Sequence, residues 1–177
     1  MLQRLSMAQL ERPSLAEAKS LAKLPIVIVL DGIRSLNNVG SFFRTADALG
    51  AERILLCGIT GTPPHRDIRK TALGAEDSVA WSAYPNIADG LAQLITEGYT
   101  ICAVEQTSQP TWLPSFAPAA GSKVALVFGN EVDGVSDGAL ALADMALEIP
   151  QMGMKHSLNV AVAGGIVLWH VSQQLRG

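Results

Sequence analysis

The chain has 177 residues, of which 49% are hydrophobic and 16% are charged, and its formal net charge is −3. This length fits one domain, and this composition favours a substantial core over long disordered segments. No apolar run approaches the ~20 residues that a membrane span needs, and residues 1–23 lack the apolar segment of a signal peptide. The sequence therefore predicts a cytoplasmic protein without a membrane association.

Charge is distributed unevenly along the chain. Residues 1–70 hold ten Lys and Arg against six Asp and Glu, whereas residues 71–177 hold three against ten. The negative total argues weakly against nucleic-acid binding, but the basic half could still meet a polyanion. A solvated surface with uneven charge is the equally weighted alternative.

The predicted elements alternate between helices and strands. Ser14 and Glu17 form a capping box that predicts a short helix over residues 14–23, which Pro25 ends. Uninterrupted aliphatic runs predict strands that are buried on both faces. Strands are expected at 26–30, 53–57, 79–84, 99–104, 123–128 and 144–149, and helices at 39–49, 86–97, 136–143 and 157–175. Residues 58–75 are expected to form a long loop.

This order predicts an α/β fold with a mostly parallel sheet and helices on both faces. Residues 1–24 would form a short helical extension, and residues 25–177 the main domain. Ligands of such sheets bind beyond the carboxyl ends of the strands. Four polar loops follow predicted strands there, at 31–38, 105–109, 129–134 and 150–156, so a single site between them is expected.

Familiar cofactor and metal signatures are absent from the sequence. No GxGxxG follows the first strand, and the segment between Gly129 and Gly134 lacks the Lys and Ser/Thr of a P-loop. The three histidines lack metal-ligand spacing, so no metal site is predicted. Cys57 and Cys102 lie in separate apolar strands, which favours buried free thiols over a disulfide.

One predicted helix carries a charged residue close to its apolar side. Asn38 occupies a position where a helix N-cap is expected, and Arg44 follows between Phe43 and Ala46. An arginine there needs an anionic partner or an outlet to solvent. A salt bridge to Glu131 and a phosphate clamp in an active site explain it equally well.

Three segments of the chain together resemble known motifs. They are Asn38-Val39-Gly40 with Arg44-Thr45-Ala46, then Phe128-Gly129-Asn130-Glu131 with Gly134, then Ile149-Pro150 with Ser157-Leu158-Asn159-Val160. In this order and spacing they resemble the TrmH branch of the SPOUT RNA methyltransferases. The resemblance covers about residues 25–175, and residues 63–75 resemble the connecting loop of that family.

The resemblance implies an activity and a fold. Such enzymes transfer a methyl group from S-adenosyl-L-methionine, without a metal, to a ribose 2′-hydroxyl of tRNA or rRNA. The family fold ties the C-terminal part of the sheet into a deep trefoil knot, and its members are homodimers. The compact chain, without an additional RNA-recognition domain, slightly favours tRNA as the substrate.

The resemblance also implies roles for particular residues. The catalytic set would be Arg44, Asn38, Glu131, Ser157 and Asn159, and the cofactor would lie against Val104, Gly129, Ile149, Leu158 and Ser157. RNA phosphates would meet His65, Arg66, Arg69 and Lys70. A guanidinium keeps its proton at neutral pH, so phosphate positioning by Arg44 is easier to justify than proton removal, which stays open.

Two other functions are compatible with the sequence. A catalytically silent RNA-binding or assembly factor could use the same fold, although the intact motif residues favour the enzyme. A small-molecule α/β enzyme would depend on Arg44 but not on Arg69 or Lys70.

Overall fold

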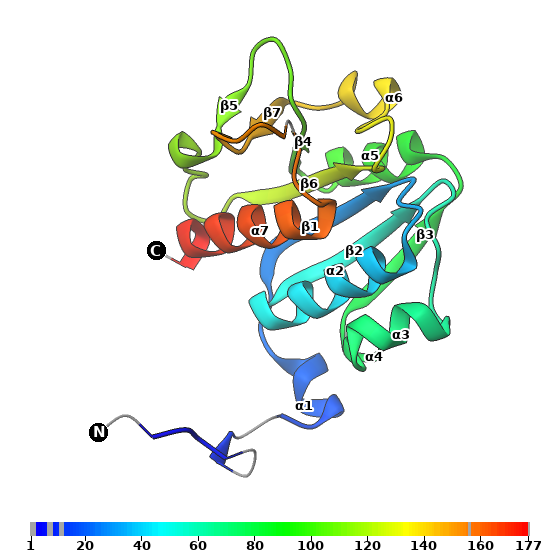
Figure 1. Ribbon diagram of the computed structural model, residues 1–177, viewed down its shortest axis with the longest axis vertical. Coiled ribbons are helices and arrows are strands. Elements are labelled where there is room, and N and C mark those ends of the chain that lie inside the picture. Colours follow the sequence, from blue (N-terminus) through cyan, green and yellow to red (C-terminus); the bar gives the residue numbers. More distant parts are fainter. Residues whose placement is uncertain (1–2, 7–8, 11–12, 156, 177) are drawn as a thin grey trace.

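The computed structural model describes residues 3–6, 9–10, 13–155 and 157–176. Within these residues seven strands form one parallel sheet, in the order β3-β2-β1-β6-β4-β7-β5 (Figure 1). The strands are β1 (Leu24–Asp31), β2 (Ala51–Cys57), β3 (Ala80–Tyr84), β4 (Tyr99–Val104), β5 (Thr111–Trp112), β6 (Lys123–Gly129) and β7 (Met145–Glu148). The predicted α/β fold with a parallel sheet is confirmed.

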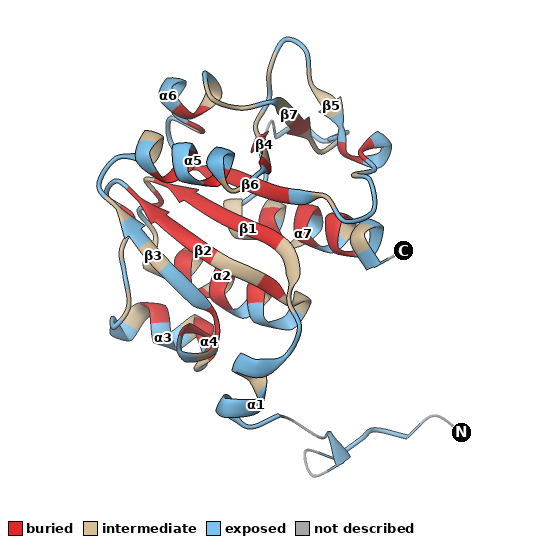
Figure 2. Ribbon diagram, turned by 180° about the vertical axis from the view of Figure 1, so that it is seen from behind, coloured by how far each residue is buried: buried red, intermediate tan, exposed pale blue. Residues whose placement is uncertain are grey.

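Helices cover both faces of this sheet, as expected. They are α1 (Leu15–Ser20), α2 (Leu36–Leu49), α3 (Arg66–Ala72), α4 (Ala75–Ser78), α5 (Ile87–Thr96), α6 (Asp137–Leu140) and α7 (Val160–Arg176), with a 3-10 turn η2 (Leu113–Ser115). One buried cluster joins the sheet to α2, α3 and α7, and the other joins it to α5 and α6. The buried residues in Figure 2 follow the central strands and the inner sides of α2 and α7.

Three details of the sequence interpretation were wrong. Residues 58–75 are not a continuous loop, because α3 and the start of α4 lie in it. These helices are too short to show a clear apolar period, and α3 ends in the left-handed Leu73 with a φ of 55°. The short β5 and η2 were also not predicted, and α7 begins at Val160 rather than at Ser157.

Helix α2 is the centre of the packing on one face of the sheet. Phe42 contacts Phe128 of β6, with 4.9 Å between the ring centroids, and α7 lies beside α2 (Figure 1). Both neighbouring helices approach it closely at glycines. A Cβ on Gly40 would lie 2.2 Å from the carbonyl oxygen of Ile68 in α3, and a Cβ on Gly164 of α7 would lie 2.3 Å from the Phe42 ring.

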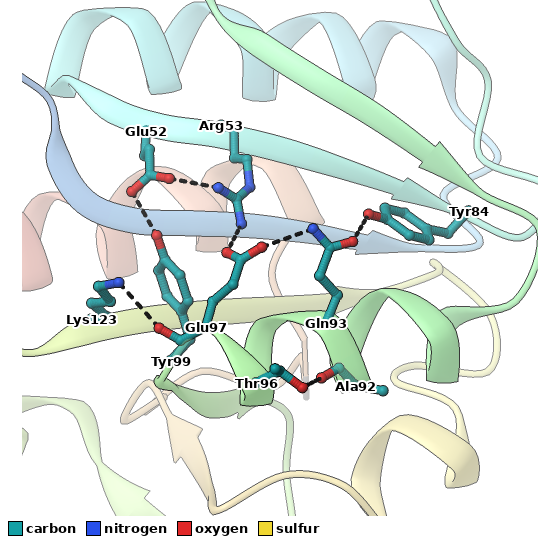
Figure 3. A network of polar contacts seen from close by, with 9 residues as sticks. All are labelled: Glu52, Arg53, Tyr84, Ala92, Gln93, Thr96, Glu97, Tyr99 and Lys123. Carbon is teal, nitrogen blue, oxygen red and sulfur yellow. Dashed lines mark hydrogen bonds and ion pairs between the residues drawn. The ribbon is translucent and has the colours of Figure 1, made fainter.

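A polar network joins the elements at the amino ends of the strands (Figure 3). Arg53 of β2 forms ion pairs with Glu52 and with Glu97 at the end of α5. The Tyr99 hydroxyl donates to Glu52 over 2.6 Å, and Lys123 donates to the Glu97 carbonyl over 3.1 Å. This network lies at the edge opposite the polar loops, so it contributes to the packing of α5 rather than to the site.

Other expectations concern single segments. Ser14 caps α1 in the predicted capping box. Cys57 and Cys102 are buried free thiols, as expected, and burial raises the pKa of each to about 12. In the part of the chain that the structure describes, no helix has the length and apolar character of a bilayer span.

Candidate functional site

A cavity of about 590 Å³ opens where β4, β6 and β7 end. Its walls come from the loops that follow these strands and from the start of α7, so three of the four predicted loops meet there. The lining includes every residue predicted to hold a cofactor, namely Val104, Gly129, Ile149, Ser157 and Leu158. Ser157 and Leu158 are exposed at its rim, and His156 lies outside the described residues.

A chain of side-chain hydrogen bonds joins the three sequence motifs at the mouth of this cavity. Asn159 Nδ2 donates to Asn38 Oδ1 over 3.3 Å, and Asn38 Nδ2 donates to Glu131 Oε1 over 2.7 Å. These residues are far apart in the sequence. The structure therefore brings together three of the five predicted catalytic residues, and the other predicted residue of the third motif, Ser157, lines the cavity beside Asn159.

Local structure fixes the orientation of the two asparagines. Asn159 Oδ1 accepts from the backbone N–H groups of Ala161 and Val162, over 2.9 and 3.3 Å, and so caps α7. Its amide nitrogen is thereby directed towards Asn38. The sequence had placed an N-cap at Asn38, but Ser35 caps α2 and accepts from the Asn38 N–H. Asn38 lies inside the first turn, which frees its side chain for Glu131.

The loop after β6 needs glycine for its own packing. A Cβ on Gly129 would lie 1.9 Å from the carbonyl carbon of Gly134, and Gly134 has a φ of 72°. Asn130 Oδ1 accepts from the N–H groups of Val132 and Asp133, both over 2.9 Å. The loop is thus a tight, internally bonded turn that holds Glu131 at the mouth of the cavity.

Two carboxylates that were not assigned a role in the sequence anchor this turn from outside. Glu105 Oε2, at the end of β4, accepts from Val135 N over 2.9 Å, and Asp31 Oδ2, at the end of β1, accepts from Ser136 N over 2.8 Å. Both residues open loops that the sequence had marked. The signal that could have found them is an acidic residue directly after a buried strand.

The Glu131 carboxylate is held in its ionised form. Partial burial raises its pKa, but hydrogen bonds from Asn38 and from backbone N–H groups, including that of Arg34, outweigh burial and leave the pKa below its ordinary value. At neutral pH Glu131 is therefore a hydrogen-bond acceptor.

The lining of the cavity favours a cationic ligand. Four carboxylates contribute to it, those of Glu105, Glu131, Asp133 and Glu148, and no Lys or Arg is found among the described residues that line it. Within those residues no group of three or more His, Cys, Asp and Glu side chains could hold a metal ion.

Comparison with known proteins assigns this arrangement to a family. The family model described as the SpoU rRNA Methylase family matches residues 25–169, which contain all three motifs. The chain belongs to the SpoU rRNA methylase family.

Two curated relatives illustrate the similarity. The 23S rRNA (guanosine-2′-O-)-methyltransferase RlmB of Neisseria meningitidis is 30% identical over 88% of this chain and 61% of its own length. The tRNA (guanosine(18)-2′-O)-methyltransferase of Thermus thermophilus is 31% identical over 84% of this chain and 75% of its own length. The chain thus spans less than two thirds of the Neisseria protein.

A solved structure agrees with the fold. The AdoMet-bound rRNA methyltransferase from Sinorhizobium meliloti superposes with a TM-score of 0.80 at 26% identity, over 89% of this chain and 60% of that one. The parallel sheet and its helices are therefore those of the SpoU rRNA methylase family.

Arg44 is not joined to the other motif residues in this structure. It lies on α2 six residues after Asn38, about 9 Å further along the helix axis. Its side chain is exposed, and the described residues give it no ion pair. Among the described residues Arg44 forms no salt bridge with Glu131, which the sequence had allowed. Its guanidinium is solvated instead.

The four basic residues expected to contact RNA are gathered on α3 and are all exposed. His65 caps the helix by accepting from Asp67 N, and Arg69 lies 3.6 Å from Glu76 and 3.3 Å from Asp77. Thr71 of the same helix donates to the Asn37 carbonyl over 2.9 Å. That bond fixes α3 next to Asn38, so the basic cluster lies on the same side of the molecule as the site.

Proposed function

We propose that this protein is an S-adenosyl-L-methionine-dependent RNA methyltransferase that modifies a ribose 2′-hydroxyl. The observation that carries the proposal is the hydrogen-bonded chain from Asn159 through Asn38 to Glu131, at the mouth of a cavity of about 590 Å³. It unites the three motifs of the family. The two curated relatives described above are named as guanosine 2′-O-methyltransferases of rRNA and tRNA.

The cavity fits this cofactor in size and charge. Ligand sites commonly enclose about 300–1,000 Å³, and the carboxylates of the lining complement the sulfonium and amino groups of the cofactor. Val104, Gly129, Ile149 and Leu158 would hold it, and Ser157 would contact it at the rim. When bound, the cofactor supplies a methyl group that is already labile on its sulfonium, so no metal is required.

The protein would contribute mainly alignment. Asn38 and Glu131 would orient the ribose so that its 2′-oxygen takes the methyl group in line, while Asn159 holds Asn38. The ionised Glu131 carboxylate can accept a hydrogen bond from the hydroxyl. Arg44 would place positive charge near the substrate phosphate, with proton removal as its alternative role.

The substrate would be tRNA or rRNA, as in the named relatives, and the protein would act in the cytoplasm. Its basic cluster on α3 would contact phosphates beside the site. Lys70 has no ion pair among the described residues, so it can contact a phosphate without first breaking a protein contact, unlike Arg69.

The proposed homodimer has a suitable surface on α7. Val162, Ile166 and Trp169 are spaced on one side of this helix and remain 53%, 41% and 57% exposed. A contiguous apolar stripe of this kind marks an interaction surface. A second copy packing on it would bury the stripe and bring α7, which Asn159 caps, into the interface.

We also propose that the C-terminal part of the sheet is tied in the trefoil knot of the family fold. Strand β7 pairs between β4 and β5, and the chain then returns so that α7 packs beside α2 against β1 and β6. In the proposed knot, this returning segment would pass through a loop formed by earlier residues of the chain.

Calorimetry with S-adenosylmethionine tests the function, combined with methyl transfer to RNA from cells that lack this gene. We expect binding by the wild type, and binding without turnover by Asn38→Ala, because Asn38 is outside the cavity lining. A wild-type protein that binds RNA but no cofactor would instead be the silent RNA-binding factor.

A further inference from the structure

A cationic residue outside the three motifs lies beside the hydrogen-bonded side chains of Asn159, Asn38 and Glu131. Arg34 belongs to the loop between β1 and α2, and its backbone N–H donates to Glu131 Oε2 over 3.4 Å. Its Nη2 atom lies 3.6 Å from Asp133 Oδ2, and the two side chains are 57% and 68% exposed. Arg34 is therefore fixed at its backbone, while its guanidinium remains accessible.

The charges at the mouth of the cavity oppose the binding of RNA. Glu131 and Asp133 line the mouth and carry the same sign of charge as RNA phosphates. Like charges at an interface oppose binding. A strand whose ribose reaches Glu131 must therefore bring its phosphates close to these carboxylates, and a cation there would offset the repulsion.

The contact between Arg34 and Asp133 is poorly suited to a structural role. Its N–O distance of 3.6 Å is longer than the roughly 2.7–2.9 Å of a charge-assisted hydrogen bond. Exposed ion pairs of this kind contribute little to stability. A guanidinium has five N–H donors in a fork that matches a phosphate, and Asp133 engages one nitrogen within this distance.

We propose that Arg34 binds a phosphate of the RNA strand next to the methylated ribose, and that Asp133 holds its guanidinium until the phosphate displaces it. The inference rests on the proposed function, because it assumes that RNA enters this mouth. Asp133 then acts as an internal competitor of RNA. Its backbone N–H bond to Asn130 keeps the turn in place when the carboxylate is released.

Binding of unmodified tRNA and rRNA, taken from cells that lack the gene, tests this proposal. The variants are Asp133→Asn, Arg34→Ala, Arg34→Lys and the double variant Asp133→Asn with Arg34→Ala. Removing the competing carboxylate should lower the Kd of the better-bound RNA about twofold to fivefold. Arg34→Ala should raise it about fivefold to tenfold and reduce the slope of log K against log salt by about one.

Two further readouts separate this role from a structural one. Asp133→Asn should raise RNA affinity less in the Arg34→Ala background, where only its repulsion of phosphate is removed, than in the wild type, where it also frees Arg34. Arg34→Lys should restore part of the affinity and of the salt slope. The two single Arg34 variants should bind S-adenosylmethionine as the wild type does, because Arg34 is outside the cavity lining. An unchanged Kd for Arg34→Ala, or the same gain from Asp133→Asn in both backgrounds, would overturn the proposal.

Failure of the proposed function would be seen differently. RNA affinity is measured without turnover, so a protein that binds RNA through Arg34 but transfers no methyl group would contradict the enzyme and leave the phosphate contact intact. If all variants methylate RNA and also bind it with equal affinity, only the contact between Arg34 and the phosphate is contradicted.

Discussion

At the scale of single residues, the site depends on amide groups whose orientation is fixed by backbone partners. Asn159 cannot turn its amide without losing the cap of α7, and Asn38 lies between Asn159 and Glu131. Preorganised groups of this kind need no rearrangement when the substrate arrives. The outcome is a Glu131 carboxylate whose position and charge are both set before RNA binds.

Arg44→Ala is expected to lower the rate of methyl transfer by about 10²- to 10³-fold, the range associated with the loss of one preorganised electrostatic group. Cofactor affinity should be nearly unchanged, because Arg44 lies on α2 outside the cavity lining. Single-turnover methyl transfer and calorimetry measure the two quantities. Turnover at the wild-type rate would remove Arg44 from the catalytic set.

Gly129→Ala is expected to destabilise the protein by about 2–3 kcal/mol, because the new Cβ would overlap the backbone of Gly134 and the turn would have to move. Cofactor affinity should fall with it. Gly138→Ala in α6 is the control, since a Cβ there meets nothing within 4 Å; it should change stability by less than about 1 kcal/mol. Urea denaturation tests both, and equal effects of the two substitutions would refute the packing argument.

At the scale of elements, much of the fold followed from the sequence and some of it could not. Six of the seven strands were located from the sequence. Aliphatic runs identify β1, β2, β4 and β6, because a strand covered on both faces leaves no alternation to misread, whereas β3 lies at the edge of the sheet and is largely exposed. The two-residue β5 has no pattern of its own, since its pairing partner β7 decides its position. Likewise, α3 was not predicted, because it is too short to show an apolar period. It is placed by its packing against Gly40 of α2, a residue that is distant in the sequence.

The candidate site shows the same division. The loops at the strand ends were predictable, because polar residues directly after buried strands carry that information, and the motif residues were implied by the resemblance to a known family. The bonds from Asn159 to Asn38 and onward to Glu131 were not, because they depend on how α2, α7 and the loop after β6 are placed. For Arg44 the sequence allowed a salt bridge to Glu131 and a phosphate clamp equally, and its position on α2 leaves it exposed.

The network of Figure 3 predicts how stability depends on pH. Hydrogen bonds from Gln93 and Arg53 lower the pKa of Glu97 in the folded protein. Glu97 therefore stabilises the fold fully above its unfolded-state pKa of about 4.5, and this contribution is lost as the pH falls through the lower folded-state pKa. Glu97→Gln should cost about 1 kcal/mol at pH 7.

The destabilisation caused by Glu97→Gln should disappear at low pH. Urea denaturation of wild type and Glu97→Gln at pH 7, 5, 4 and 3 would show the difference in unfolding free energy shrinking towards zero at the lowest pH. A difference that persists unchanged at pH 3 would mean that the carboxylate charge is not what the network uses.

At the scale of the whole molecule, the apolar stripe on α7 predicts the oligomeric state. Trp169→Glu should convert the proposed dimer to a monomer, because a charge would be buried without a partner. Gln174→Glu, which adds the same charge on the same helix away from the stripe, is the matched control and should remain dimeric. Sedimentation equilibrium distinguishes them. A monomeric wild type would exclude the proposed dimer. A dimeric Trp169→Glu variant would place the interface elsewhere.

The atom that receives the methyl group defines the proposed activity. Wild-type protein should be incubated with S-adenosylmethionine carrying a labelled methyl group and with RNA from cells that lack the gene, and the product mapped by alkaline hydrolysis and mass spectrometry of nucleosides. We expect label on one ribose 2′-oxygen, which protects the adjoining phosphodiester from alkali. Label on a base, or no label in RNA despite cofactor binding, would contradict the proposed activity.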